Sequence, residues 1–416
     1  MLRARQLFVP HCRVAKNIQH LDKAHFLFKA MPVKRPFGAV AGQAGDAGSY
    51  SGGAPVAAAA TAATNEGAPA LGFLAPATGG GGVEGVAENN SSGVWMKLAI
   101  AAMILACLFV LARNALRMIE RKMLFPGPHM PVPFADALKG PEGARYARLG
   151  VRSYTVPQDD GASPIRYFAA FPLELHPSEY AGSVVVLHGN ACSAAECTID
   201  MVPALTSARV AVFFVEYPGY ASDPLKTKPS ECTLLDNAVR AIDHLTSTRH
   251  APADKPLVLF GISLGCAVAT YAASQRPRAV HGLFLLAPFT SVADLVATRI
   301  PHVPFKWIIK SNFNAGAWAR RVVCPVTIAH GTDDVIVPLH LGEKLAAQFA
   351  VKPNFVLVER GGHNDMLVDH PDKIWPACRS ALAAAAAFDA IGGAAVESTR
   401  GGAAPRDRRP LDGGAR

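Results

Sequence analysis

The sequence predicts an α/β protein with a doubly wound, mainly parallel sheet, preceded by a single transmembrane helix. In the second half of the chain, short apolar runs alternate with helical stretches, which is the pattern of a mainly parallel sheet covered by helices on both faces. Right-handed crossovers between successive parallel strands make such a sheet doubly wound. Ahead of this region, the stretch from Gly93 to Ala112 carries a single charge, Lys97. Half of the 416 residues are hydrophobic, so a sizeable core can form.

The first 92 residues predict a disordered region with two parts. Residues 1–38 hold eight Lys and Arg against one acid, Asp22, which is typical of a mitochondrial transit peptide. A basic disordered arm, or an extension upstream of a true start at Met31, explains the same pattern. Residues 39–92 are mainly Ala, Gly, Pro, Ser and Thr and offer too little apolar surface to offset the entropy of ordering. Asn89 and Asn90 begin two Asn-x-Ser sequons, which matter only in a lumenal segment.

Residues 93–112 predict a transmembrane helix, because twenty residues in an α-helix span about 30 Å, the thickness of the hydrocarbon core. Trp95 lies where an interfacial aromatic belongs, and Lys97 can snorkel to the surface. The uncharged part, 98–112, is short and alanine-rich, so a buried helix of a soluble domain is the alternative. Positive charge follows directly, at Arg113, Arg117, Arg121 and Lys122. We therefore expect this side, with the C-terminal domain, to face the cytosol.

From Met123 onward the pattern predicts one folded domain, residues 123–390. Proline and glycine at 126–128 end the membrane helix. Residues 149–156 and 165–171 predict an antiparallel pair of strands. Further strands are expected at 183–187, 210–216, 257–262, 282–287, 326–329 and 355–359. Helices are expected between or after them, at 234–245, 339–349 and 381–390. Residues 391–416 are rich in Gly, Ala, Arg and Pro and predict a disordered tail.

The sequence Gly261-x-Ser263-x-Gly265 lies between the strand at 257–262 and a helix with one face of small residues. This context exposes a serine as a nucleophile, and the glycines are needed because side chains there would collide with strand and helix. The start of the helix also places N–H groups and a positive dipole end beside a developing oxyanion. A plain glycine turn explains the motif by itself, so the interpretation depends on partners for Ser263.

A nucleophilic serine requires a base, an acid that orients the base, and an oxyanion hole. In this strand–turn–helix context the order along the chain is serine, acid, histidine. Asp333 and Asp334 follow the strand at 326–329, and His363 follows two glycines after the strand at 355–359. We therefore expect His363 to be the base and one of the two aspartates to be its acid.

The oxyanion hole is expected from two backbone amides. Residues 184–191 end a strand in a tight polar turn, where the second amide of such a hole arises. We assign the hole to the N–H groups of Asn190 and Leu264, and we expect His188 to be a structural hydrogen-bonding residue rather than a second base. This chemistry needs no cofactor and no metal, and the eight cysteines lack metal-ligand spacing. No basic stripe with interleaved aromatics is present, so we expect no nucleic-acid partner.

Seven short stretches recur in one known family: His188–Ala191, Glu216–Tyr220, Lys228–Glu231, Gly261–Gly265, Ala287–Ser291, His330–Asp334 and Gly362–Asp365. Through them, residues 123–390 resemble the α/β-hydrolase superfamily, and most closely its membrane-tethered α/β-hydrolase-domain branch, which includes protein depalmitoylases. The resemblance implies the α/β-hydrolase fold with a short cap, and a triad of Ser263, Asp334 and His363.

The resemblance also implies a membrane-anchored serine hydrolase that cleaves acyl esters or thioesters of a lipid or protein at the bilayer, protein depalmitoylation included. A serine peptidase of the same fold and a non-catalytic membrane scaffold are the alternatives. Depalmitoylase members have a cysteine-rich, lipidated N-terminus, whereas this chain has Cys12 alone ahead of its predicted membrane helix. Residues 289–322 occupy the place of the family's cap and are apolar from Ile300 to Ile309. This stretch predicts either an acyl-chain groove or ordinary cap packing.

Overall fold

The computed structural model of the chain describes residues 91–126, 136, 138–139, 143–220, 227–301 and 309–391. Of the predicted disordered region at 1–92, the structure describes Ser91 and Ser92 alone, so Asn89 and Asn90 of the sequons lie outside the described residues. Of the predicted tail at 391–416, it describes residue 391 alone. Among the described residues, two compact units are separated between Phe109 and Val110. The helix α3 (Ser91–Leu124) crosses this boundary, and the α/β domain belongs entirely to the second unit.

The α/β domain contains an eight-stranded sheet with the strand order β1-β2-β4-β3-β5-β6-β7-β8. β1 and β2 pair antiparallel, β2 pairs antiparallel with β4, and every later pairing is parallel. This is the mainly parallel, doubly wound sheet that the sequence predicts. The strands are β1 (Arg152–Val156), β2 (Ile165–Ala170), β3 (Gly182–Leu187), β4 (Val210–Glu216), β5 (Leu257–Ile262), β6 (Gly282–Leu286), β7 (Val326–Gly331) and β8 (Asn354–Val358).

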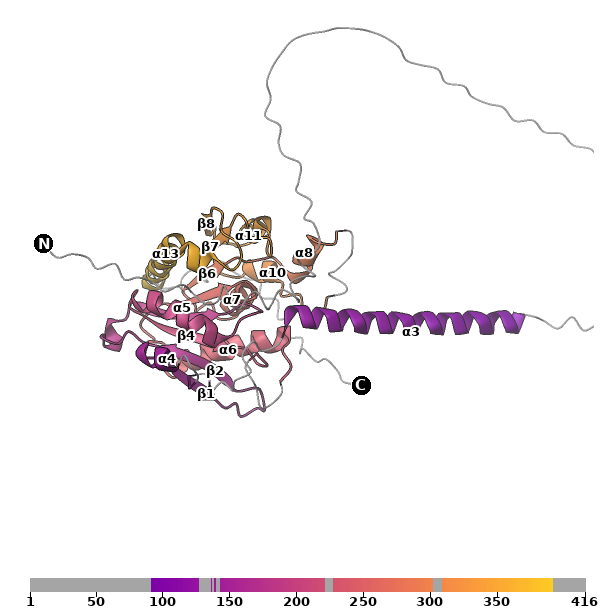
Figure 1. Cartoon of the computed structure of the whole chain (residues 1–416), viewed down its shortest axis with the longest axis horizontal. Coiled ribbons are helices and arrows are strands. Elements are labelled where there is room, and N and C mark those ends of the chain that lie inside the picture. Colours follow the sequence, from indigo (N-terminus) through magenta and orange to yellow (C-terminus); the bar gives the residue numbers. More distant parts are fainter. Residues whose placement is uncertain are drawn as a thin grey trace, which may run out of the picture. The chain divides into compact units, whose positions relative to one another are not determined.

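Helices cover both faces of the sheet (Figure 1) because the central strands are apolar on both sides. Along β5, Leu257 and Leu259 belong to one buried cluster, whereas Val258 and Phe260 belong to the other, as the two-residue period of a strand requires. The first cluster includes residues of α6 (Glu231–Ser247), α7 (Leu264–Gln275), α10 (Ala315–Ala319) and α11 (Leu339–Ala346). The second includes residues of α4 (Gly143–Arg148), α5 (Ala194–Thr206) and α13 (Pro371–Ala390). The remaining elements are η3 (Pro177–Glu179), α8 (Val292–Ala297) and α12 (Met366–Asp369).

Several predicted boundaries differ from the structure, and three of these differences have a local reason. The first strand begins at Arg152 rather than 149, because Gly150 has a positive φ of 65° in the turn that follows α4. The helix predicted at 234–245 begins earlier, where the Ser230 side chain accepts from the Thr233 N–H as an N-cap. The last helix begins at Pro371 rather than 381. Pro376 lies inside it, and this apparent helix breaker hides the first turns from pattern reading.

The apolar part of α3 is the single helix of the described residues that is long and apolar enough to cross a membrane. Its 34 residues extend beyond the predicted span of 93–112, because the helix continues through the basic stretch to Leu124. Large apolar side chains along it are exposed, including Trp95 at 71% and Phe109 at 69%. A helix packed inside a soluble core would bury such side chains, so α3 is a candidate transmembrane span.

Candidate active site

Ser263 occupies the sharp turn between β5 and α7, with φ 52° and ψ −113°. This backbone conformation is strained for a serine, at a cost of about 1–3 kcal/mol, and such strain clusters at functional sites. Its backbone N–H donates to the Leu286 carbonyl at 2.9 Å, which ties the turn to the end of β6. The motif glycines allow close approach: a Cβ on Gly265 would lie 1.9 Å from the Leu187 carbonyl oxygen, and one on Gly261 would lie 2.7 Å from Cys266 Cα.

His363 and Asp334 complete a hydrogen-bonded chain that begins at the serine. His363 Nε2 lies 3.0 Å from Ser263 Oγ, although the two residues are 100 positions apart. On the other side of the ring, His363 Nδ1 lies 2.7 Å from Asp334 Oδ2. The Asp334 side chain has no exposed surface, and its Oδ1 accepts from the backbone N–H groups of Ile336 and Val337 at 2.9 and 2.7 Å. These donors fix the carboxylate in the orientation that the imidazole needs.

The structure brings one of the two candidate aspartates to the histidine. Asp333 is exposed, its backbone N–H donates to the Gly361 carbonyl, and its carboxylate accepts from the Thr332 hydroxyl at 3.1 Å. Asp334 turns inward from the same loop to His363. Asp333 thus holds the β7 loop against the loop after β8, and Asp334 is the acid in contact with the ring.

The loop after β3 lies beside the serine. A Cβ on Gly189 would lie 3.7 Å from Ser263 Cβ, so the following residue, Asn190, is close to the nucleophile. Within the described part of the chain, the backbone N–H groups of Asn190 and Leu264 donate to no carbonyl or side chain. The Leu264 amide is also the first of α7, where helical N–H groups lack an intrahelical partner. Neither amide is therefore engaged by another acceptor among the described residues.

Comparison with known proteins gives this arrangement a family. Residues 178–316 match the family Hydrolase_4, described as serine aminopeptidase, S33. An uncharacterized protein of Mycobacterium tuberculosis is 31% identical over 247 residues, 59% of this chain and 81% of that protein. The alpha/beta hydrolase domain-containing protein WAV2 of Arabidopsis thaliana is 26% identical over 182 residues, 39% of this chain and 58% of that protein. The chain belongs to the α/β-hydrolase superfamily.

A further relative lies in the same branch of α/β-hydrolase-domain proteins. Lysophosphatidylserine lipase ABHD12 of Mus musculus is 27% identical over 179 residues, 39% of this chain and 44% of the lipase. The chain thus spans about half the length of the two named relatives. Together with the eight-stranded sheet, these matches identify the chain as a hydrolase of the α/β-hydrolase-domain branch.

His188 of this hydrolase holds the loop after β3 rather than contacting the serine. Its side chain is buried, with Nδ1 2.8 Å from the Gly189 carbonyl oxygen and Nε2 3.1 Å from Glu216 Oε1. The Glu216 carboxylate also accepts from the N–H groups of Ala194, at the start of α5, and Tyr217. The Tyr217 hydroxyl donates back to the His188 carbonyl at 3.1 Å. Sequence reasoning assigned His188 a structural role but missed Glu216 as the centre of this network, although Glu216 begins one of the family stretches.

The β7 loop has a similar internal support. His330 is fully buried, its Nε2 donates to the Val337 carbonyl at 2.9 Å, and it lies 3.6 Å from Asp334 Oδ2. Burial lowers the pKa of His330, opposed by the Val337 carbonyl and by Asp334. Its Nδ1 has no hydrogen-bond partner among the described residues. The imidazole therefore braces the loop that presents Asp334, a role that its place in a family stretch did not reveal.

All seven cysteines in the described part of the chain are free thiols, and two of them pack together at the start of α5. Cys192 and Cys197 lie 3.0 Å apart, Sγ to Sγ, on either side of the N-cap Ser193 of α5. These are the positions of a hydrophobic staple, which fixes the entry of the chain into the helix. Among the described residues, no group of three or more His, Cys, Asp or Glu is placed to hold a metal ion.

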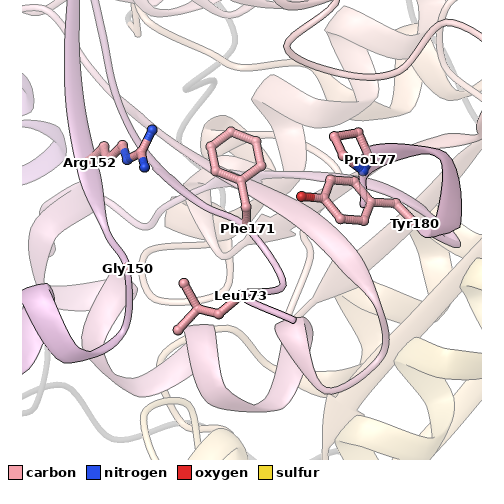
Figure 2. A pocket seen from close by; sticks show the side chains of 6 residues that line it. All are labelled: Gly150, Arg152, Phe171, Leu173, Pro177 and Tyr180. Atoms are coloured by element: carbon pink, nitrogen blue, oxygen red, sulfur yellow. The ribbon is translucent and has the colours of Figure 1, made fainter. Parts of the chain in front are cut away.

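The predicted cap stretch is described only at its two ends. α8 and α10 lie within it, Ile300 is 39% exposed, and Ile309 packs against the core. Residues 302–308, including Trp307, lie outside the described residues, so the acyl-groove interpretation stays a prediction. A cavity of about 330 Å³ lies elsewhere, lined by Gly150, Arg152, Phe171, Leu173, Pro177 and Tyr180 (Figure 2). These residues flank the start of β1, the end of β2 and the start of β3. They therefore lie at the opposite end of the strands from Ser263, which follows the C-terminal end of β5.

Proposed function

We propose that this α/β-hydrolase is a membrane-anchored serine hydrolase that cleaves acyl esters or thioesters through a triad of Ser263, His363 and Asp334. The observation that carries the proposal is the continuous chain from Ser263 Oγ through both nitrogens of His363 to Asp334, with distances of 3.0 and 2.7 Å. A nucleophile hydrogen-bonded to a base, which is in turn oriented by a buried acid, is the arrangement that activates a serine at neutral pH.

The reaction has two stages. His363 Nε2 takes the proton of Ser263 as Oγ attacks the acyl carbonyl carbon, and the carbonyl oxygen becomes an oxyanion that the Asn190 and Leu264 amides stabilise. The tetrahedral intermediate collapses, the bond to the alcohol or thiol breaks, and His363 gives its proton to that leaving group. Water then attacks the acyl-enzyme with His363 as base, which releases the fatty acid and returns the proton to Ser263 Oγ.

Asp334 acts on the imidazole rather than on the substrate. Its Oδ2 accepts from His363 Nδ1, which keeps the Nε2 lone pair directed at the serine and stabilises the imidazolium that forms. The two backbone donors on Oδ1 hold the carboxylate in the orientation that meets the imidazole.

Two findings support an acyl substrate at a membrane. One relative in the same branch is named a lysophosphatidylserine lipase, and an acyl ester of a lipid is a substrate of the class that the proposed chemistry cleaves. α3 is apolar enough to cross a bilayer, and a short connection would then hold the domain near acylated lipids or acylated proteins. The family described as serine aminopeptidase favours a peptidase as the second candidate.

Activity-based labelling tests the nucleophile directly. The full chain in membranes should react covalently with a fluorophosphonate probe, and Ser263→Ala should abolish the labelling. Undiminished labelling of Ser263→Ala would assign the nucleophile elsewhere, and a wild-type protein that never labels would favour a non-catalytic scaffold.

A matched substrate panel separates the two enzyme classes. We expect turnover of acyl esters or thioesters with acyl chains of two to twelve carbons, and none of the corresponding peptide amides. If the site accommodates a long chain, kcat/KM should rise with chain length, because each buried methylene contributes about 0.8 kcal/mol. Cleavage of the amides with no turnover of esters or thioesters would make the protein a peptidase.

We also propose that α3 spans the bilayer with the hydrolase domain in the cytosol. The support is the apolar helix itself and the basic residues in its last turns, Arg121 and Lys122 among them, because positive charge favours the cytosolic side. Alkaline carbonate should leave the full chain in the membrane pellet, and protease added to sealed cell-derived vesicles with the cytosolic side outward should digest the domain. Release by carbonate would contradict a spanning helix, and recovery of the protein in mitochondria would favour the transit-peptide interpretation of residues 1–38.

A further inference from the structure

The last turn of α3 and the residue that follows it, Glu120–Phe125, pack onto the α/β domain; we call this segment the juxtamembrane turn. It belongs to the same compact unit as the domain. Phe125 is 7% exposed, and its ring meets Tyr220 and Phe313 edge-on, with centroids 6.5 and 6.2 Å apart. Aromatic pairs at these distances contribute about 0.5–1.5 kcal/mol beyond the area that they bury. The juxtamembrane turn is therefore anchored in the core cluster on one face of the sheet.

One group of contacts joins the juxtamembrane turn to the loop after β3. The Asn190 side chain donates from Nδ2 to the Met123 carbonyl at 3.2 Å, and the Tyr220 hydroxyl donates to the Leu124 carbonyl at 3.4 Å. The last four carbonyls of a helix have no intrahelical donor, so these side chains satisfy two carbonyls at the end of α3. Asn190 is thus held by its side chain to α3, while its backbone N–H remains available beside Ser263.

A second group of contacts joins the juxtamembrane turn to the segment that leads into α10. Glu120 Oε1 accepts from the backbone N–H groups of Lys310 and Ser311 at 3.1 and 2.6 Å. The next two N–H groups, those of Asn312 and Phe313, donate to Glu231 at 2.8 and 2.9 Å. Two carboxylates from different helices therefore bind four successive backbone amides.

The segment held by these two carboxylates, residues 310–313, is close to the catalytic elements. The Asn312 carbonyl accepts from the Val292 N–H at 2.8 Å, at the start of α8. α10, which begins two residues after Phe313, packs against α7, the helix that begins behind Ser263. Phe313 has a positive φ of 44°, a conformation that a non-glycine residue adopts at a cost, and the Glu231 carboxylate holds its N–H in place.

We propose that the juxtamembrane turn is a positioning element of the active site, with Glu120 and the Asn190 side chain as positioning residues. This role rests on the proposed serine chemistry. Besides serving as an anchor, α3 sets the position of the Asn190 amide in the oxyanion hole. Neither Glu120 nor the Asn190 side chain touches the reacting atoms. Their loss should displace donors that act on the oxyanion, which exists only after attack, and should leave the binding of a small substrate unchanged.

The test uses the full chain in detergent with p-nitrophenyl butyrate, whose short acyl chain needs little binding surface. Asn190→Ala keeps the backbone amide and removes the bond to Met123. Loss of an entire oxyanion donor costs about 10²–10³ in kcat, so displacement of the donor should lower kcat by roughly 10- to 100-fold and leave KM within about twofold. The rate of fluorophosphonate labelling should fall in parallel, because the phosphonate oxygen occupies the same hole.

Glu120 gives an independent arm with a conservative rescue. Glu120→Ala should lower kcat by about tenfold, whereas Glu120→Gln should stay within about threefold of the wild type, because a single oxygen already accepts from both Lys310 and Ser311. Met118→Ala is the matched control, since Met118 lies in the same part of α3 and is 57% exposed. A control variant that loses as much kcat as Glu120→Ala would attribute the loss to α3 in general and overturn the proposal.

Hydrogen exchange tests the inference without any activity. In Glu120→Ala, the amides of residues 310–311 should exchange at least about tenfold faster, with global unfolding temperature little changed, because their acceptor is gone. Unchanged exchange and unchanged kcat in Asn190→Ala and Glu120→Ala would overturn the proposal while leaving the serine mechanism intact. A wild-type protein that hydrolyses no ester and labels with no fluorophosphonate would instead contradict the proposed function, and the exchange result would still decide whether Glu120 holds residues 310–311.

Discussion

Gly265→Ala is the substitution whose effect the structure specifies most closely. A methyl group on Gly265 would lie 1.9 Å from the Leu187 carbonyl oxygen, 2.6 Å from the Leu187 carbonyl carbon and 2.7 Å from the His188 carbonyl oxygen. Cβ atoms in proteins essentially never approach other atoms below 3.0 Å, so α7 and the end of β3 must separate by at least 1.1 Å (3.0 minus 1.9). All of the contacted atoms are backbone, so no side-chain rotation relieves the clash.

The separation falls between the two halves of the proposed oxyanion hole. Leu264, at the start of α7, would move with the helix, whereas Asn190 follows the end of β3. A misplacement of about 1 Å in a catalytic arrangement costs roughly 10²-fold in rate. Overpacking of this kind costs about 1–3 kcal/mol, and at about 2–4 °C per kcal/mol for a domain of this size the Tm should fall by about 2–12 °C.

The assay compares kcat/KM for a short-chain ester and the thermal unfolding of the full chain in detergent. Gly189→Ala is the control for stability, because its methyl group would make ordinary contacts at 3.7 Å and should leave Tm nearly unchanged. We expect Gly265→Ala to lose at least about 100-fold in kcat/KM. A Gly265→Ala protein with wild-type Tm and wild-type kcat/KM would refute both the close approach of α7 to β3 and the role of the paired amides.

Three further predictions concern buried polar groups around the site. Asp334→Asn should lower kcat by up to about 10⁴-fold, since an amide favours the wrong imidazole tautomer, whereas Asp333→Asn should retain most activity; the reverse ranking in steady-state kinetics would reassign the acid. Glu216→Ala should lower the free energy of unfolding by at least about 1–3 kcal/mol in urea titrations, because it leaves the buried donors of His188, Ala194 and Tyr217 without their acceptor; a loss below about 1 kcal/mol would contradict the network. Burial lowers the pKa of His330 in the folded protein. As the pH falls below about 6.5, the imidazole therefore takes up a proton in the unfolded chain before it does so in the folded chain. The neutral ring stabilises the fold above that pH, and below it the free energy of unfolding falls by up to about 1.4 kcal/mol per pH unit. His330→Asn should flatten this slope relative to the wild type, and parallel slopes would show that other groups control the acid loss.

The sequence predicted the sheet well because its strands are apolar on both faces and short. The predicted strand at 210–216 and the one at 257–262 agree with β4 and β5 at both ends. Each is a run of large or β-branched residues bounded by turn residues, so local pattern and tertiary position agree. The strand ends predicted Ser263, His363 and one of two aspartates, and the family resemblance implied Asp334; the structure places the His363 side chain within hydrogen-bonding distance of the other two.

Contacts between distant segments were out of reach of pattern reading. In the sequence, Glu216 is the polar residue that ends a strand. Only the fold brings its carboxylate within hydrogen-bonding distance of His188 and of the first N–H group of α5. The choice between Asp333 and Asp334 depends on which carboxylate turns inward from one loop, and adjacent residues share every sequence signal. For Glu120 the obstacle was different: it is the single acid in a basic helix end, and a charge there is ordinarily a solvated side chain.

The charge pattern at the end of α3 is consistent with two requirements on one short segment: orientation in the membrane and contact with the α/β domain. Orientation in the membrane depends on Lys and Arg near the end of a span, and acidic residues contribute little to it. A single glutamate among basic residues is therefore compatible with a cytosolic domain, and it supplies the carboxylate that binds Lys310 and Ser311. Replacing Glu120 with Lys would keep the orientation signal but lose the acceptor and oppose two N–H dipoles with a cation. We expect such a protein to insert with the same topology in the protease assay and to lose kcat at least as strongly as Glu120→Ala, which separates the anchoring role of α3 from its role at the active site.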